Sequence, residues 1–390
     1  MEKIRLGIIG IGNMGSGHAG NVTEGRCPEF VLSAIADTNP ARLDWARGKY
    51  GEGVTYFDDA ITMLDSGKID ACIVSVPHYD HPRYAMECMK RGIHVMVEKP
   101  AGVYTKQVRE MNECAAQHPD VVFGMMFNQR TNHVYRKMRE LVQSGKYGQL
   151  RRTNWLITNW YRPQAYYDSG DWRATWSGEG GGVLLNQCPH QLDLWQWICG
   201  MPVAVRTEMH FGQWHDIEVE DDVTTYVEYP NGATGVFVTT TGDGFGSNRF
   251  EVQLDGAKLV VENDELTVYE FEMSEPEFSR TNKIPFGSVK VNKIPVETDG
   301  QNPQHVGVLN AWAGAILRGE PLVAGGAEGI NGLTLSNAMH LSAFTNQKVT
   351  LPFDEDLFYE ELMKRVAVSR RKAPGQAVFA DTSNTYGGTK

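Results

Sequence analysis

The chain has 390 residues, enough to form two domains with a large buried core. Its hydrophobic content of 41% and charged content of 22% are those of an ordinary globular protein. The net charge is −11 and no basic block offsets it, so the composition argues against a nucleic-acid partner or an anionic membrane surface.

The N-terminal stretch predicts a dinucleotide-binding turn. An apolar run from Ile4 to Ile9 indicates a buried strand, which a helical segment follows. Gly10, Gly12 and Gly15 form a GxGxxG pattern between the two. Gly10 permits the tight turn, Gly12 removes a side chain that would keep a pyrophosphate from the backbone, and Gly15 lets the helix approach the sheet. The helix N-terminus then presents free N–H groups to the phosphates.

An acidic residue follows the second predicted strand. That strand runs from Phe30 to Ala36, and Asp37 comes roughly twenty residues after the last glycine of the turn. An acid there binds the hydroxyls of the adenosine ribose and repels a 2′-phosphate, so NAD is favoured over NADP. Arg42 is close enough to keep NADP as the less favoured alternative.

Short apolar strands alternate with helical patterns up to residue 127. The predicted strands are Ile4 to Ile9, Phe30 to Ala36, Ala71 to Val76, His94 to Val97 and Val121 to Met126. This alternation predicts a parallel, doubly wound sheet, in which ligands bind beyond the carboxyl ends of the strands. The chemistry is therefore expected at Gly10, Asp37, Pro77 to His81, Glu98 to Pro100 and Phe127 to Arg130.

The pattern changes in the second part of the chain. The predicted elements are a helix from His133 to Ser144, an extended segment from Arg151 to Tyr161, a helix from Leu184 to Cys199 after a Gly-rich segment, and strands Val223 to Tyr229, Gly235 to Thr241 and Phe250 to Leu254. Hairpin turns between the strands predict an open, mostly antiparallel sheet. Helices from His305 to Leu317 and Gly329 to Asn346 are expected to cover its inner face, and the outer face to mediate homo-oligomerisation.

Three regions are therefore predicted. A dinucleotide-binding domain spans residues 1–127, an α/β domain for substrate binding and oligomerisation spans 128–372, and an irregular tail spans 373–390. The six cysteines form no CxxC pair, which favours reduced thiols and a cytoplasmic protein. Neither a signal peptide nor a membrane-spanning run is expected.

Lys99 stands at the end of a predicted strand, between Glu98 and Pro100. Pro100 disfavours the helical conformation at Lys99, so the lysine is expected to be extended at the mouth of the sheet. A partly desolvated lysine beside a nicotinamide ring can polarise a hydroxyl or share its proton. The alternative is a surface lysine paired with Glu98.

A second candidate lies in the helix after the Gly-rich segment. Asn186 and His190 are four residues apart and would share one helix face, with Asp193 three residues further. Imidazole titrates near neutrality, which suits a base that accepts a hydroxyl proton while hydride leaves the adjacent carbon. The alternative is a histidine that caps the helix or belongs to the core.

Aromatic residues between Trp155 and Trp176 are interleaved with arginines and aspartates. Flat rings beside hydrogen-bonding groups suit a pyranose, although some of these rings are expected in the core. The candidates for the pocket are Tyr161, Arg162, Trp172 and Arg173. Both arginines leave open a nucleotide-sugar or phosphorylated substrate, but pairing with Asp168 or Asp171 is favoured. His78, His81 and His94 complete no clear zinc set, so no metal is expected.

Three motifs in this order resemble the Gfo/Idh/MocA family of NAD(P)-dependent sugar and cyclitol oxidoreductases. They are Gly10-Ile11-Gly12-Asn13-Met14-Gly15, Glu98-Lys99-Pro100, and the Gly-rich helix with His190 and Asp193. The resemblance implies a Rossmann domain, an α/β domain on a large open sheet, and dimers or tetramers formed through that sheet. By position, Lys99 is similar to the family's catalytic lysine and His190 to its proton-transferring histidine.

The chain departs from the family pattern at two positions. An aspartate usually stands four residues before the histidine, whereas this chain has Asn186, whose amide binds a hydroxyl but cannot take its proton. We therefore expect lower pKa values for His190 and Lys99 than an aspartate would give. Cys188-Pro189 replaces a more frequent glycine and is similar to members that act on glycosides or anhydrosugars.

The expected function is oxidation of a secondary hydroxyl of a sugar, glycoside, anhydrosugar or cyclitol by NAD, at C3 of a pyranose by resemblance. His190 would remove the hydroxyl proton and Lys99 would steady the alkoxide. The expected cofactor-binding residues are Gly10, Gly12, Asn13, Met14, Asp37, Pro77, His81, Glu98, Lys99 and Asn128. The expected substrate-binding residues are Tyr161, Arg162, Trp172, Arg173, Asn186 and His190. Two alternatives are an enzyme that cleaves glycosides through a 3-keto intermediate and recycles bound NAD, and a non-catalytic sensor of NAD and sugar.

Overall fold

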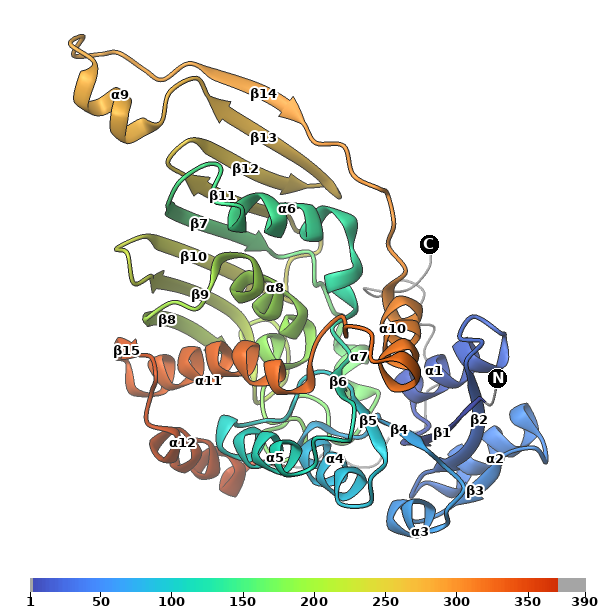
Figure 1. Ribbon diagram of the computed structural model, residues 1–390. Coiled ribbons are helices and arrows are strands. Elements are labelled where there is room, and N and C mark those ends of the chain that lie inside the picture. Colours follow the sequence, from blue (N-terminus) through green and yellow to red (C-terminus); the bar gives the residue numbers. More distant parts are fainter. Residues whose placement is uncertain (1–2, 371–390) are drawn as a thin grey trace.

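Two β-sheets organise residues 3–370, the part of the chain that this computed structural model describes (Figure 1). Within those residues the first sheet has six strands in the order β3-β2-β1-β4-β5-β6. The second has nine in the order β14-β13-β12-β11-β7-β10-β9-β8-β15. The tail predicted over residues 373–390 lies outside the described residues, and the domain division at residue 127 stays a prediction.

The first sheet is parallel throughout its described strands. They are β1 (Ile4–Ile9), β2 (Phe30–Ala36), β3 (Thr55–Phe57), β4 (Ala71–Val74), β5 (His94–Val97) and β6 (Phe123–Met125). The connecting helices are α1 (Asn13–Thr23), α2 (Pro40–Tyr50), α3 (Ala60–Asp65), α4 (His81–Met89) and α5 (Thr105–Gln117). The predicted doubly wound fold is confirmed, with β1, β2 and β5 at the predicted bounds and with β4 and β6 shorter. The sequence analysis missed β3, because its three half-buried residues form no apolar run.

The second sheet is open and mostly antiparallel, as predicted. Its strands are β7 (Leu150–Ile157), β8 (Ala204–Phe211), β9 (Glu220–Glu228), β10 (Thr234–Thr240), β11 (Asn248–Leu254), β12 (Ala257–Glu262), β13 (Glu265–Phe271), β14 (Val291–Pro295) and β15 (Val349–Thr350). Among the described pairs only β7 and β10 run parallel. Its inner face is aromatic: the Trp155 ring stacks on Phe250 at 4.2 Å, and the Trp195 ring on Phe237 at 5.3 Å.

Helices from three parts of the chain lie over one face of this sheet, as Figure 1 shows: α6 (His133–Gln143), α8 (Pro189–Cys199) and α11 (Gly329–Thr345). The remaining described α-helices are α7 (Gln164–Asp168), α9 (Glu275–Thr281), α10 (Gln304–Arg318) and α12 (Glu355–Val368). The cover predicted for residues 329–346 is therefore confirmed.

The prediction that residues 305–317 cover the large sheet is wrong, because α10 packs on the first sheet. Its buried residues Leu309 and Trp312 belong to the core around β1 and β2, and the Trp312 ring lies 5.4 Å from Phe30. Amphipathic periodicity shows that a helix buries one face, but it does not say against which sheet.

The single helix predicted from Leu184 to Cys199 is also wrong, because the chain breaks into two segments there. A π-helical turn spans Val183–Gln187 and α8 begins at Pro189. Pro189 has no N–H to continue the first segment, whereas the first position of a new helix tolerates it. Asn186 and His190 therefore do not share the face of one continuous helix.

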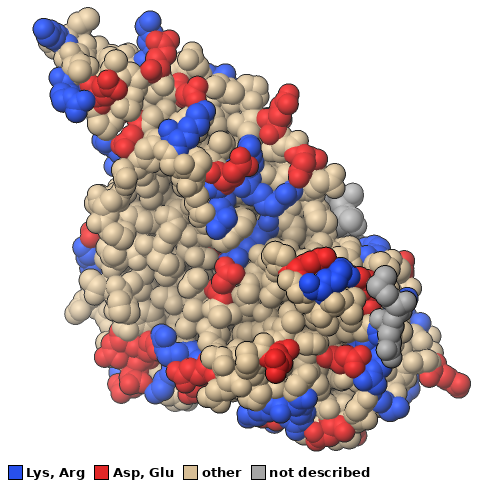
Figure 2. All heavy atoms as spheres, in the orientation of Figure 1, with Lys and Arg blue, Asp and Glu red and all other residues tan. Residues whose placement is uncertain are grey.

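The surface carries charges of both signs. Figure 2 shows Lys and Arg side chains interspersed with Asp and Glu on the face that it displays. All six cysteines are unpaired thiols, five of them buried, as the expectation of reduced thiols requires.

Candidate active site

The glycine turn after β1 has the shape that a dinucleotide requires. Gly10 has φ +88°, and a Cβ there would lie 2.3 Å from the Ser75 carbonyl oxygen. A Cβ on Gly15 would lie 1.9 Å from the Gly10 oxygen, whereas a Cβ on Gly12 would meet nothing within 4 Å. Gly12 therefore borders open space at the N-terminus of α1, which has no side-chain cap. These features fit a pyrophosphate that approaches the backbone.

Asp37 is held at the end of β2 by two backbone groups. Its carboxylate accepts hydrogen bonds from Ile11 N at 2.8 Å and from Asn39 N at 2.8 Å. Burial lowers the pKa of Arg42, and the nearby Asp37 opposes this effect. The acid is therefore fixed beside the glycine turn, and Arg42 lies near it.

Glu98 lies buried among histidines at the end of β5. Its Oε1 is 2.6 Å from His18 Nε2, and its Oε2 accepts a hydrogen bond from Lys99 N at 3.1 Å. Burial opposes ionisation, but the hydrogen bond from His18 lowers the pKa of Glu98 to about 2. The His305 ring lies 5.5 Å from His18, and burial lowers the pKa of His305 to about 4. Neither histidine was predicted as a site residue, because His18 in α1 and His305 in α10 come together from distant parts of the chain.

Lys99 reaches from the first sheet to the second domain. Its Nζ donates a hydrogen bond to the Asn186 carbonyl oxygen at 3.0 Å. Glu98 contacts the backbone N–H of Lys99, so the structure does not support a surface lysine that pairs with Glu98. Burial lowers the pKa of Lys99, and Arg173 acts in the same direction.

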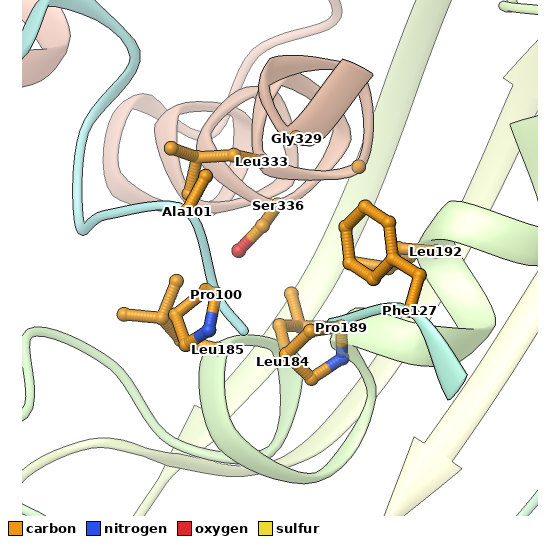
Figure 3. Close-up of a pocket in the computed structure, with 11 residues that line it drawn as sticks. Pro100, Ala101, Phe127, Leu184, Leu185, Pro189, Leu192, Gly329, Leu333 and Ser336 are labelled. Atoms are coloured by element: carbon orange, nitrogen blue, oxygen red, sulfur yellow. The ribbon is translucent and has the colours of Figure 1, made fainter. Parts of the chain in front are cut away.

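An apolar contact between the two domains fixes this arrangement. Figure 3 shows Pro100, Phe127, Leu184 and Pro189 converging on a small cavity, with a helical turn of α11 on the far side. The cavity measures about 10 Å³, the space of one water, and its lining is almost entirely apolar. Close packing at this junction positions the residues that flank Lys99 and His190.

His190 is buried at the start of α8. Its ring lies edge-on to Phe127 at 6.3 Å, and its Nδ1 has no hydrogen-bond partner among the described residues. Burial lowers the pKa of His190 well below 6.5, and the nearby Lys99 adds to the effect. Burial therefore favours the neutral imidazole, which is the form that can accept a proton. The nearby Asp193 instead forms a buried, two-pronged ion pair with Arg130, at 2.7 and 2.8 Å.

Asn186 connects Lys99 to a network in the second domain. Its Oδ1 accepts a hydrogen bond from Tyr166 Oη at 3.4 Å, and Tyr166 Oη accepts one from Arg173 at 2.9 Å. Its Nδ2 donates to the carboxylate of Glu179, which is 2% exposed. Burial raises the pKa of Glu179. Sequence reasoning missed Glu179, although a lone acid inside a glycine run was an available signal.

The predicted pocket residues lie around this network. The Arg162 guanidinium lies 5.2 Å from the centre of the Tyr166 ring, and that of Arg173 lies 4.6 Å from Trp172. Arg162 donates to the carbonyl of Tyr161, a residue that is 47% exposed. Arg173 faces Glu179 at 3.9 Å, a partner that the favoured pairing with Asp168 or Asp171 did not anticipate.

Two further predicted residues, His81 and Asn128, follow strands β4 and β6 of the first sheet. Both ring nitrogens of His81 contact backbone carbonyl oxygens: Nε2 lies 2.7 Å from Val76 O and Nδ1 lies 2.6 Å from Pro100 O. Asn128 donates to Gln304, and its Oδ1 is buried without a partner among the described residues. Their contact with a cofactor stays a prediction. Within residues 3–370 no three His, Cys, Asp or Glu side chains converge as metal ligands, and no helix is long and apolar enough to span a bilayer.

Two family descriptions match separate parts of the chain. Residues 4–125 match the oxidoreductase family with an NAD-binding Rossmann fold, and residues 135–260 match the GFO/IDH/MocA C-terminal domain. The chain belongs to the Gfo/Idh/MocA family. Its first domain is an NAD-binding Rossmann domain.

Individual members of the Gfo/Idh/MocA family resemble the chain at modest identity. Myo-inositol 2-dehydrogenase of Thermotoga maritima is 25% identical over 271 residues, which are 67% of this chain and 75% of that protein. D-glucoside 3-dehydrogenase of Escherichia coli is 27% identical over 249 residues, 59% of this chain and 68% of that protein. The chain spans about half to three quarters of the length of the curated relatives that it matches.

A solved member of the family matches over more of the chain. The WlbA dehydrogenase of Chromobacterium violaceum, in complex with NADH and UDP-GlcNAcA, superposes with a TM-score of 0.78 and 26% identity. The superposition covers 91% of this chain and 97% of that one. The two-domain fold is therefore that of a family member that holds NADH.

Proposed function

We propose that this protein oxidises a secondary hydroxyl of a sugar, glycoside, anhydrosugar or cyclitol, with NAD as the hydride acceptor. One observation carries the proposal: Lys99, at a strand end of the NAD-binding sheet, bonds to the carbonyl of Asn186, beside the turn that leads to the buried His190. The relatives named for myo-inositol and D-glucosides, and the one in complex with UDP-GlcNAcA, support a carbohydrate ring as substrate.

The chain's own residues divide the work at the hydroxyl. NAD, when bound, supplies the acceptor for the hydride that leaves the carbon. His190, neutral because of its burial, takes the hydroxyl proton as the carbon–oxygen double bond forms. The Lys99 ammonium donates a hydrogen bond to the oxygen on which negative charge develops.

The cofactor is placed along the strand ends. The proposed cofactor-binding residues are Gly10, Gly12, Asn13, Met14, Asp37, Pro77, His81, Glu98, Lys99 and Asn128. Asp37 favours NAD over NADP, because a 2′-phosphate would meet its charge. We place the substrate against Tyr161, Arg162, Trp172, Arg173, Asn186 and His190. The relative named D-glucoside 3-dehydrogenase supports C3 as the oxidised carbon of a pyranose.

Formation of NADH at 340 nm tests the proposal. Purified protein with NAD, and separately with NADP, is assayed against inositols, free sugars, anhydrosugars and aryl glycosides. We expect NADH with one of these groups, and a loss of roughly 10²- to 10⁴-fold in turnover for His190→Ala with NADH binding intact. Silence across the panel with NADH binding intact contradicts it. In that case, release of the aglycone without net NADH identifies the NAD-recycling cleavage enzyme. If no aglycone is released, the sensor is identified.

We also propose that two copies pair through the outer face of the second sheet. The register places Val238 beside Leu156 and Val236 beside Tyr226, and Leu156 is 42% exposed. This apolar centre favours self-association into a dimer or tetramer. Light scattering at micromolar concentration tests it: we expect an oligomer that Leu156→Arg dissociates, and a monomeric parent protein contradicts it.

A further inference from the structure

Glu179 is a buried acid beside Asn186 that has no role in the proposed proton transfer. We propose that Glu179 is a positioning residue for the proton-transfer pair: its carboxylate orients the Asn186 amide and faces the cations Lys99 and Arg173. The proposal rests on the proposed roles of Lys99 and His190. Glu179 lies in the loop before the π-helical turn and not at the end of a strand.

The Glu179 carboxylate contacts its own loop and two predicted substrate-binding residues, Asn186 and Arg173. Its Oε2 accepts a hydrogen bond from Ala174 N at 2.6 Å, and its Oε1 accepts one from Asn186 Nδ2. Arg173 lies 3.9 Å from Oε1. A carboxylate that is 2% exposed is costly to bury unless such partners satisfy it.

The backbone of this loop is shaped to present the carboxylate. Ala174 has φ +56°, in the left-handed region that residues with a Cβ rarely adopt. Gly180, directly after Glu179, has φ +82°, and a Cβ there would lie 2.3 Å from a methyl carbon of Val103. Such conformations persist where the surrounding structure over-determines them, and they cluster at functional sites.

The contact with Glu179 decides which way the Asn186 amide points. A carboxylate accepts hydrogen bonds only, so the amide NH₂ faces Glu179 and Oδ1 faces Tyr166. The backbone oxygen of the same Asn186 receives Lys99 Nζ. Glu179 therefore acts on Lys99 through Asn186, and it also supplies negative charge near it.

Charges of both signs face Lys99. Burial is the largest influence on the pKa of Lys99 and lowers it, Arg173 and Arg162 lower it further, and Glu98 and Glu179 raise it. The titratable histidines nearby are His78, His81, His190 and His305. Of the two acids, Glu98 has the larger effect on Lys99 and also contacts His18, so removal of the Glu179 charge leaves Glu98 to oppose Arg173 and Arg162.

A reciprocal exchange of the acid and the amide tests the proposal. The variants are Glu179→Gln, Asn186→Asp and the double variant, compared on the substrate that the NADH panel identifies. Glu218→Gln is the matched control, because Glu218 also accepts a backbone N–H in this region, from Trp176 at 3.2 Å. All variants are first checked for unchanged NADH binding and thermal melting.

We expect Glu179→Gln to lower kcat roughly 10- to 100-fold with the KM for NAD unchanged, and Glu218→Gln to leave both unchanged. Asn186→Asp puts two carboxylates in contact, which cannot both ionise, so its kcat also falls by about 10-fold or more. The double variant again pairs one acid with one amide and recovers at least about 10-fold over Glu179→Gln. Unchanged kcat in Glu179→Gln, or a double variant whose loss equals the product of the single losses, overturns the proposal.

A measurement without turnover separates this proposal from the proposed function. The Lys99 side chain is titrated by NMR in protein labelled with ¹³C-lysine, its signal assigned through Lys99→Met. We expect the midpoint in Glu179→Gln to fall by about 0.5 to 1 pH unit relative to the parent. An unchanged midpoint refutes the role of Glu179 even if no substrate is found, whereas a lowered midpoint in a protein without dehydrogenase activity refutes only the proposed function.

Discussion

Three glycines at the start of α1 should respond to alanine in three different ways. A Cβ on Gly15 would lie 1.9 Å from the Gly10 oxygen, an overlap with backbone that no side-chain rotation relieves. We expect Gly15→Ala to lower the free energy of unfolding by about 3 kcal/mol. A Cβ on Gly12 meets nothing within 4 Å, so Gly12→Ala should cost less than about 1 kcal/mol. Its methyl group would nevertheless occupy the space where the pyrophosphate approaches the backbone.

NADH binding distinguishes Gly12 from Gly17, the third glycine of this comparison. We expect Gly12→Ala to raise the Kd for NADH roughly 10- to 100-fold, or about 1.4 to 2.8 kcal/mol. Gly17 lies inside α1 and also borders open space, so Gly17→Ala should add up to about 1 kcal/mol of stability and leave NADH binding unchanged. Urea unfolding gives the stabilities and calorimetric titration the affinities. Normal NADH affinity in Gly12→Ala, or normal stability in Gly15→Ala, would refute the geometry of the turn.

Three further predictions concern titration and cofactor choice. Because burial lowers the pKa of His190 well below 6.5, kcat/KM for oxidation should stay level as the pH falls from 8 to 6, and a midpoint near 6.5 would show an exposed imidazole. The pKa of His305 falls from 6.5 to about 4 on folding, so the unfolded chain takes up the proton first. The contribution of His305 to the free energy of unfolding is therefore fully present above pH 6.5. It falls by about 2 to 3 kcal/mol as the pH is lowered to 4. Urea unfolding of His305→Gln should show a correspondingly smaller loss over this range, and an identical loss would contradict the assignment. Asp37→Ser should raise the ratio of kcat/KM for NADP to that for NAD at least about 10-fold, and an unchanged ratio would separate Asp37 from the ribose.

The first domain could be predicted closely because its signals are local. The apolar runs of β1, β2 and β5 are bounded by turn residues, so their ends follow from the sequence. The GxGxxG turn likewise lies within a few residues, and its geometry is the one that the pattern requires. Local patterns of this kind are independent of where other parts of the chain lie.

The predictions failed where contacts between distant parts of the chain determine the structure. The apolar face of α10 fits the core around Phe30, and periodicity alone does not distinguish that core from the large sheet. Pro189 divides one helical pattern into two segments, which changes the relation of Asn186 to His190. Glu179 reaches the site because its loop turns back onto Asn186, and no sequence spacing encodes that contact.

Transfer of deuterium tests the central claim most directly. The substrate that the NADH panel identifies is prepared with deuterium at each secondary carbon in turn, and the mass of the NADH formed is measured for the parent protein and for His190→Ala. We predict NADH one mass unit heavier for one labelled carbon only, and formation of that product roughly 10²- to 10⁴-fold slower in His190→Ala. Unlabelled NADH from every carbon, or an unchanged rate in His190→Ala, would contradict hydride transfer with His190 as the base.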